Sequence, residues 1–265
     1  MTGAMTAELR LDDVSWHFGR VKAVDGVSLA VERGARHAVI GPNGAGKTTL
    51  FGVVAGTLRP SAGRVLVGGR DVTRLSEHAR ARLGVVRTFQ HSSVFLSMTA
   101  LDNVALAVQR VRGVGTRLWL PARRYVEVTE RALGHLESVG LADRAGESAA
   151  TLSHGERRQL EVAVALAARP RLLLLDEPTA GMSVEESSRF TDVIRELPVD
   201  VTVLVIEHDL DVVFRLASHV TVLHLGRVLA DGTPEEVRDS EEVQRAYLGA
   251  ADSSELFFSP EEERT

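Results

Sequence analysis

The glycine-rich segment GPNGAGKT, residues 41–48, constrains the fold of this 265-residue chain more than any other feature. It follows the short apolar run His37–Ile40 and precedes a helical pattern that reaches Ala55. A buried strand that ends in a glycine-rich turn and continues into a helix is a unit of α/β proteins. The segment therefore predicts a strand, a tight turn and a helix within such a sheet.

The same segment has the residue types that bind phosphate. Its glycines allow backbone N–H groups to surround an anion, and the following helix directs its positive end toward it. Lys47 supplies a positive charge, and the Thr48 hydroxyl can bind Mg²⁺. The alternative is a structural turn with an accidental lysine, which the flanking strand and helix disfavour. The predicted nucleotide-binding residues here are Gly41, Pro42, Asn43, Gly44, Ala45, Gly46, Lys47, Thr48 and Thr49.

Two acids end a second apolar run, LLLLDEP at residues 172–178. Ligands of open α/β sheets bind at the carboxyl ends of the strands, where Asp176 would lie. Asp176 is predicted to hold Mg²⁺, and Glu177 to activate the attacking water as a general base. Alone, two acids at the end of a strand are as readily explained by solvent exposure. The phosphate-binding segment favours the functional interpretation.

The remaining pattern predicts an α/β fold with helices on both faces of the sheet. Alternating residues around 14–18 and 27–31 indicate antiparallel strands, while residues 89–168 are mostly helical, with a loop or short hairpin expected over 110–124. Further strands are expected at 171–175, 201–206 and 220–225, and helices at 184–196 and after Thr233. Residues 1–7 and 251–265 are expected to be flexible tails.

Bulk properties exclude several classes of protein. The net charge is −5 with no basic stripe, so nucleic acid is not an expected partner. The chain has no cysteine and hence no disulfide. Its apolar runs are far shorter than a membrane span, so any span is expected to come from another chain. A guanine-specific N-K-x-D element is also missing from the sequence, which disfavours a GTPase.

With LSHGE at residues 152–156 between the two motifs, the chain resembles the ATP-binding subunit of an ABC transporter over residues 8–250. The resemblance implies an α/β P-loop NTPase (RecA-like) core at 8–88 and 166–250, an antiparallel β subdomain, and a helical signature subdomain at 89–165. It implies that Phe18 stacks on adenine, that Gln90 touches the metal and the attacking water, and that His208 contacts the γ-phosphate. The alternatives are core packing for Phe18 and an ordinary surface role for the other two.

Ser153 and Glu156 also match a capping box, the S-x-x-E pattern that satisfies a helix N-terminus. Ser183 to Glu186 is a second such pattern, to which no phosphate role is assigned. The resemblance implies that two chains pack head to tail, and that Ser153, Gly155 and Glu156 close the ATP site of the opposite chain. Compared with the common LSGGQ pattern, His154 replaces a glycine and Glu156 a glutamine, which leaves the strength of this contact open.

Several segments are similar to one branch of the family, the ATPase subunits of branched-chain amino acid importers. They are GVVRTFQH, RRQLEVA, IEHDLDVV and VQRAYLGA. The resemblance implies ATP and Mg²⁺ as cofactors, permease subunits as membrane partners, an indirect link to a solute-binding protein, and a peripheral location on the cytoplasmic face. Urea or short-amide import and lipopolysaccharide export remain alternatives, as does a soluble ABC ATPase acting on DNA or ribosomes.

Overall fold

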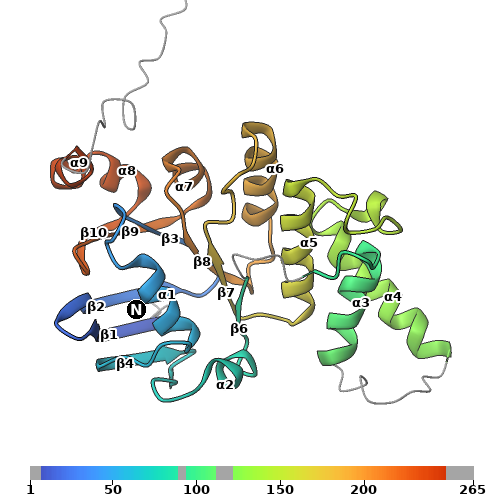
Figure 1. Cartoon of the computed structure of the whole chain (residues 1–265), viewed down its shortest axis with the longest axis horizontal. Coiled ribbons are helices and arrows are strands. Elements are labelled where there is room, and N and C mark those ends of the chain that lie inside the picture. The colour runs from blue at the N-terminus through green and yellow to red at the C-terminus, as the bar shows by residue number, and fades with distance from the viewer. Residues whose placement is uncertain (1–6, 89–93, 112–121, 249–265) are drawn as a thin grey trace, which may run out of the picture.

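The computed structural model describes residues 7–88, 94–111 and 122–248, which form two sheets and the helices around them (Figure 1). The larger sheet has six strands in the order β10-β9-β3-β8-β7-β6. All its pairs are parallel except β10 with β9. Its strands are β3 (Arg36–Ile40), β6 (Val85–Arg87), β7 (Leu172–Asp176), β8 (Thr202–Ile206), β9 (His219–His224) and β10 (Arg227–Gly232).

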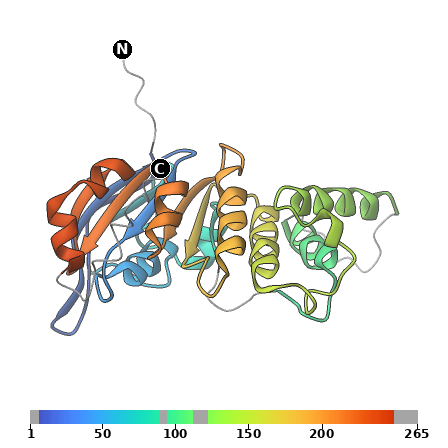
Figure 2. The same cartoon turned by 90° about the horizontal axis from the view of Figure 1, so that it is seen from above.

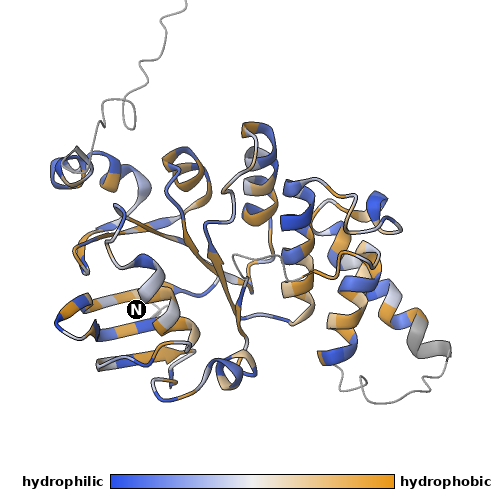
Figure 3. Ribbon diagram, in the orientation of Figure 1, coloured by the Kyte–Doolittle hydropathy of each residue, from blue (hydrophilic) through white to orange (hydrophobic). Residues whose placement is uncertain are grey.

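Strands β3, β7 and β8 are buried along their whole length, in keeping with their mostly apolar sequences RHAVI, LLLLD and TVLVI. Alternate side chains of each strand point into two different cores. Leu173 and Leu175 of β7 belong to the core on the helical face, whereas Leu172 and Leu174 belong to the core on the opposite face. In Figure 3 much of the ribbon of these central strands is coloured as hydrophobic. The sheet therefore lies between two hydrophobic cores, one on each of its faces.

A four-stranded antiparallel sheet, in the order β2-β1-β4-β5, covers one face together with α1 (Lys47–Ala55). Its long strand β2 (Val21–Glu32) alternates buried and exposed residues over 27–32, as the sequence predicts. In β1 (Ala7–Phe18) the alternation expected over 14–18 is wrong, since Val14 is buried but Phe18 is exposed. β4 (Ala62–Val67) and the two-residue β5 (Arg70–Asp71) complete it, and α2 (Glu77–Ala81) follows. Residues before Ala7 lie outside the described part.

Helices pack on the other face and extend away from it at one end. They are α3 (Ala100–Val111), α4 (Ala122–Glu137), the 3₁₀ helix η1 (Ala142–Arg144), α5 (His154–Ala167), α6 (Val184–Arg195) and α7 (Leu210–Leu216). In both Figure 1 and Figure 2, α3 and α4 lie beyond α5, the farthest from the antiparallel sheet. Among the described residues, no helix combines the length and the apolar character that crossing a bilayer needs.

The structure differs from the sequence expectation in the connecting regions. Residues 110–111 end α3 and residues 122–124 begin α4, so the loop or hairpin expected over 110–124 is wrong at both ends, and residues 112–121 lie outside the described part. Strand β10, which pairs with β9, was not indicated because most of its residues are half-exposed. The chain continues into α8 (Pro234–Arg238), capped by Thr233 as predicted, and α9 (Glu241–Leu248).

Arg80 caps the helix that follows the glycine-rich loop. Its side chain is buried and donates hydrogen bonds to the carbonyls of Val53 and Val54 at the end of α1, at 2.6 and 2.7 Å. It also donates to the carbonyls of Leu75 and Thr73. Burial lowers the pKa of the Arg80 guanidinium to about 10, yet it remains charged at neutral pH. One cation therefore satisfies the helix C-terminus and ties α2 to α1.

We expect Arg80→Leu to lower the free energy of unfolding by about 3 kcal/mol, because it leaves several buried carbonyls without a donor. Urea unfolding followed by circular dichroism measures this change. Arg82→Leu, at an exposed position two residues further along the chain, is the matched control. It is expected to change stability by less than about 0.5 kcal/mol. Equal losses in the two variants would show that Arg80 does not have this role.

Candidate nucleotide site

The glycine-rich loop, or P-loop, adopts a backbone that only glycine accommodates at two of its positions. Gly41 has a φ of 147° and Gly46 a φ of 101°. A Cβ at Gly41 would lie 2.1 Å from the carbonyl oxygen of Leu223, and one at Gly46 would lie 2.1 Å from that of Ala23. Both glycines are thus required by close approach of β9 and β2. Ala45 is buried, and its carbonyl accepts a hydrogen bond from Gly226 in the β9–β10 turn.

Lys47 folds back over the loop. Its Nζ donates to the carbonyls of Gly41 at 2.6 Å and Pro42 at 3.2 Å. Desolvation by burial lowers the pKa of this ammonium, while the negative charges of Glu177 and Asp176 oppose that shift. Both acids therefore act on Lys47, as expected of groups that surround one ligand. The lysine rests on its own loop carbonyls, which phosphate oxygens would replace.

The strand register brings the second motif to the same sheet edge. Because β8 pairs with both β3 and β7, these three strands end at nearly the same level, with Ile206 opposite Val39 and Asp176. The P-loop follows β3, the acids Asp176 and Glu177 end β7, and Glu207 and His208 follow β8. The loops after β3, β7 and β8 each carry residues predicted to be functional. They thus converge at the carboxyl ends of adjacent parallel strands.

Asp176 is almost fully buried and forms an ion pair that the sequence did not suggest. Its Oδ2 accepts a hydrogen bond from Arg87 Nη2 of β6 at 2.6 Å. Its Oδ1 is buried and has no hydrogen-bond partner among the described residues. A buried carboxylate oxygen left unsatisfied needs a ligand, because such an orphan costs about 1–3 kcal/mol.

Magnesium fits this environment. Within the described residues, no cluster of three or more acidic, histidine or cysteine side chains could hold a metal alone. Mg²⁺ commonly takes one or two protein oxygens and completes its shell with water and substrate phosphates. The free Oδ1 of Asp176 and the exposed hydroxyl of Thr48, at the start of α1, provide such oxygens beside the P-loop.

Glu177 has a strained backbone. Its φ is +46°, a left-handed conformation that costs a non-glycine residue about 1–2 kcal/mol. Its N–H donates to the Ile206 carbonyl at 3.0 Å, which holds the residue against β8. Strain of this kind is retained at functional sites where the surrounding structure imposes it. The observed conformation makes Glu177 the residue in this loop that departs most from ordinary geometry.

Glu207 is a site residue that the sequence analysis missed. It is fully buried, and its Oε1 accepts hydrogen bonds from the Thr179 N–H and hydroxyl at 3.1 and 2.6 Å. Its Oε2 accepts from the backbone N–H of His208 at 3.1 Å. One carboxylate thus connects the loop after Glu177 with the exposed His208. The signal was present, since an acid at the end of an apolar strand repeats the pattern of Asp176.

Phe18 and Gln90 complete the predicted set. Phe18 is 78% exposed at the end of β1, which excludes the alternative of core packing and leaves its ring available to a ligand. Gln90 lies outside the described residues.

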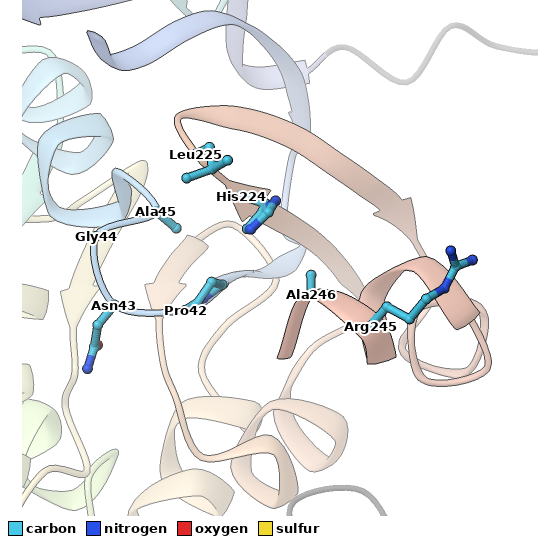
Figure 4. Close-up of a pocket in the computed structure, with 8 residues that line it drawn as sticks. All are labelled: Pro42, Asn43, Gly44, Ala45, His224, Leu225, Arg245 and Ala246. Carbon is cyan, nitrogen blue, oxygen red and sulfur yellow. The ribbon is translucent and has the colours of Figure 1, made fainter. Parts of the chain in front are cut away.

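Pro42, Asn43, Gly44 and Ala45 line a cavity of about 300 Å³, whose other wall is the β9–β10 turn and α9 (Figure 4). Burial raises the pKa of the Tyr247 phenol, which faces the Gly41 backbone from α9.

The LSHGE segment, residues 152–156, is here called the signature and lies at the start of α5. Ser153 is its N-cap, and the capping box predicted from the sequence is present, with Ser153 N–H bonded to Glu156 Oε2 at 2.8 Å. Glu156 also forms an ion pair with Arg144 at 3.3 Å, so its charge is engaged within the chain. His154 Nε2 lies 3.2 Å from the Ala180 carbonyl, and because a carbonyl only accepts, this nitrogen carries the proton.

The sheet order and the three loops at its edge define a P-loop nucleotide-binding protein. Residues 24–180 match the family model described as ABC transporter. Residues 227–253 match the model described as branched-chain amino acid ATP-binding cassette transporter. The chain therefore belongs to the ABC transporter family, as an ATP-binding and ATP-hydrolysing subunit. This confirms both the family and the P-loop NTPase fold predicted from the sequence.

Individual relatives are similar over nearly the whole chain. The high-affinity branched-chain amino acid transport ATP-binding protein BraF of Pseudomonas aeruginosa is 42% identical over 250 residues, covering 92% of this chain and 98% of BraF. The high-affinity branched-chain amino acid transport ATP-binding protein LivG of Escherichia coli is 37% identical with the same coverage. Among solved structures, an ATP-binding cassette of an ABC transporter in its ADP conformation has a TM-score of 0.80. That cassette is 31% identical, with 92% of this chain and 99% of that chain covered.

Two glycines of the P-loop give a matched test of its geometry. Gly44 has a φ of +81° but open space at the Cβ position, whereas a Cβ at Gly46 would meet the Ala23 carbonyl. We expect Gly44→Ala to cost about 1–2 kcal/mol from backbone strain alone. Gly46→Ala is expected to cost more and to abolish ATP binding, because the loop must move away from β2. Urea unfolding and isothermal titration with ATP measure both effects, and equal results for the two variants would contradict this geometry.

Proposed function

We propose that this chain is the ATPase subunit of an importer for branched-chain or other hydrophobic amino acids. The observation that carries the choice of solute is the match of the C-terminal segment, together with the relatives BraF and LivG, which are branched-chain amino acid transport ATP-binding proteins. The matched segment contains β10, α8 and α9, and α9 lines the cavity beside the P-loop (Figure 4). A segment similar to this branch therefore lies next to the nucleotide site.

At the site, the P-loop amides and Lys47 bind the phosphates of ATP, and Phe18 stacks on the adenine. Asp176 and Thr48 hold Mg²⁺, which supplies positive charge to the phosphate oxygens when bound. Glu177 accepts a proton from the attacking water, and His208 contacts the γ-phosphate. The support is the convergence of the P-loop with the ends of β7 and β8, the free oxygen of Asp176 and the strained backbone of Glu177.

The signature residues act on a different nucleotide from the one bound by their own P-loop. In both Figure 1 and Figure 2, α5 lies on the far side of α6 from α1. Ser153 and His154 are exposed at the N-terminus of α5. Two chains arranged head to tail would bring the signature of each to the P-loop of the other, with two ATP molecules between them. Nucleotide charge then holds the dimer together, and hydrolysis releases it.

We expect Glu177→Gln to bind ATP, hydrolyse it very slowly and remain trapped as a dimer, because the amide cannot accept the proton from water. Sedimentation velocity with and without ATP measures the assembly. Lys47→Ala in the same background is the control and is expected to stay monomeric, since the phosphates lose their counter-charge. A monomeric Glu177→Gln variant that binds ATP and retains normal turnover would contradict the proposal.

The transport role requires permease subunits, a solute-binding protein acting through them, and a peripheral position at the cytoplasmic face of the membrane. We expect the tagged chain to co-purify with membrane-spanning permease chains from detergent-solubilised membranes of its native host. Mass spectrometry of the purified complex identifies those chains. Recovery with ribosomes or DNA, and without a membrane protein, would instead support a soluble ABC ATPase.

A further inference from the structure

The N-terminus of α5 is joined to that of α6 through Glu186. The Ser153 hydroxyl donates to Glu186 Oε1 at 2.8 Å, and the Gly155 N–H donates to the same oxygen at 3.2 Å. The other oxygen, Oε2, accepts from the Ser183 N–H at 3.2 Å. The sequence predicted Ser183–Glu186 as an ordinary capping box, and that box is present. The structure adds a second role, because the same carboxylate also serves the signature helix.

In the head-to-tail arrangement proposed above, these two donors would meet the γ-phosphate of the nucleotide bound by the opposite chain. A serine hydroxyl carries one proton, and a backbone amide carries one. While Glu186 accepts both, neither points to another anion. The Ser153 oxygen is also engaged, since it accepts from the Glu156 N–H at 3.2 Å. In this conformation the signature is therefore already saturated by an anion of its own chain.

The fit between Gly155 and Glu186 is close. A Cβ at Gly155 would lie 3.1 Å from the Cβ, Cγ and Oε1 atoms of Glu186, tighter than ordinary contact. Glycine at this position is thus explained by the approach of Glu186. Hydrogen bonds from the backbone of Ser183, the Ser153 side chain and the backbone of Gly155 hold the pKa of the Glu186 carboxyl below its usual value. Glu186 is accordingly a carboxylate at neutral pH.

We propose that Glu186 is a positioning residue of the composite ATP site. Before dimerisation its carboxylate accepts the hydrogen bonds that the γ-phosphate bound by the opposite chain accepts in the dimer. In the chain that has not yet dimerised, this carboxylate orients the Ser153 hydroxyl and the Gly155 N–H. When two chains close around ATP, the γ-phosphate replaces the carboxylate on both donors. The proposal rests on the head-to-tail closure described above. Dimerisation then includes an exchange of one anion for another, and the affinity of the dimer depends on Glu186.

Removing the charge of Glu186 tests this exchange. In the hydrolysis-deficient Glu177→Gln background, Glu186→Gln keeps the side-chain shape and one carbonyl acceptor but loses the anion. We expect the ATP concentration for half-maximal dimerisation, measured by sedimentation velocity, to fall about fivefold, the difference between a charged and a neutral acceptor. A ligand that displaces a weaker competitor binds at lower concentration.

Two variants separate this effect from charge and from capping. Glu185→Gln removes the same charge one residue away, from an exposed side chain in the same helical turn. Glu236→Gln removes the equivalent acid from the Thr233–Glu236 capping box of α8. Both are expected to dimerise at the ATP concentration of the parent. Thermal unfolding of Glu186→Gln and Glu236→Gln is expected to show similar small losses of stability, because both lose a charged cap.

Three other outcomes would contradict the role proposed for Glu186. If the Glu177→Gln parent stays monomeric with ATP bound, the head-to-tail proposal is wrong and the role of Glu186 fails with it. If the parent dimerises but Glu186→Gln requires as much ATP or more, Glu186 is only a structural cap and this inference alone is overturned. An equal shift in Glu185→Gln would also overturn it, since the effect would then be general charge repulsion.

Discussion

The parallel pairing of β3, β8 and β7 is the constraint on which the rest of the structure depends. Ile206 lies level with both Val39 and Asp176, so the loops after these strands begin at one edge of the sheet. A slip of one residue would turn Leu173 and Leu175 into the opposite core, and both cores are already closely filled. Hydrophobic packing thereby determines where the charges of the site lie.

Those charges have internal partners in the structure. Lys47 bonds to carbonyls of its own loop, Asp176 pairs with Arg87, and the signature donors of α5 bond to Glu186. Each of these contacts satisfies a group that would be costly to leave unpaired. In the proposed function, ATP takes over the partners of Lys47 and of the signature donors, so binding there exchanges partners rather than filling an unpaired site. The free oxygen of Asp176 is the exception, and it is the one that fits Mg²⁺.

Much of the fold could be predicted from the sequence, because its strands are unusually apolar and its turns rich in glycine. The P-loop, the strands β7 and β8 and the capping boxes carry local signals that survive folding. Arg87 and Glu186 could not be assigned from the sequence, since their roles arise from contacts across 89 and 33 positions. Glu207 did carry a signal, as an acid at the end of an apolar strand, but its contact with Thr179 across 28 positions required the fold. The left-handed backbone of Glu177 likewise depends on β8, and β10 has no strong apolar pattern.

The central claim is that ATP is hydrolysed only where the P-loop of one chain meets the signature of another. The most direct test is the specific ATPase activity of the wild-type chain as a function of its concentration, with the assembly state measured by sedimentation under the same conditions. The account predicts that activity per chain rises with concentration and reaches a plateau as dimers form. Full activity per chain at concentrations where every molecule is a monomer would contradict it.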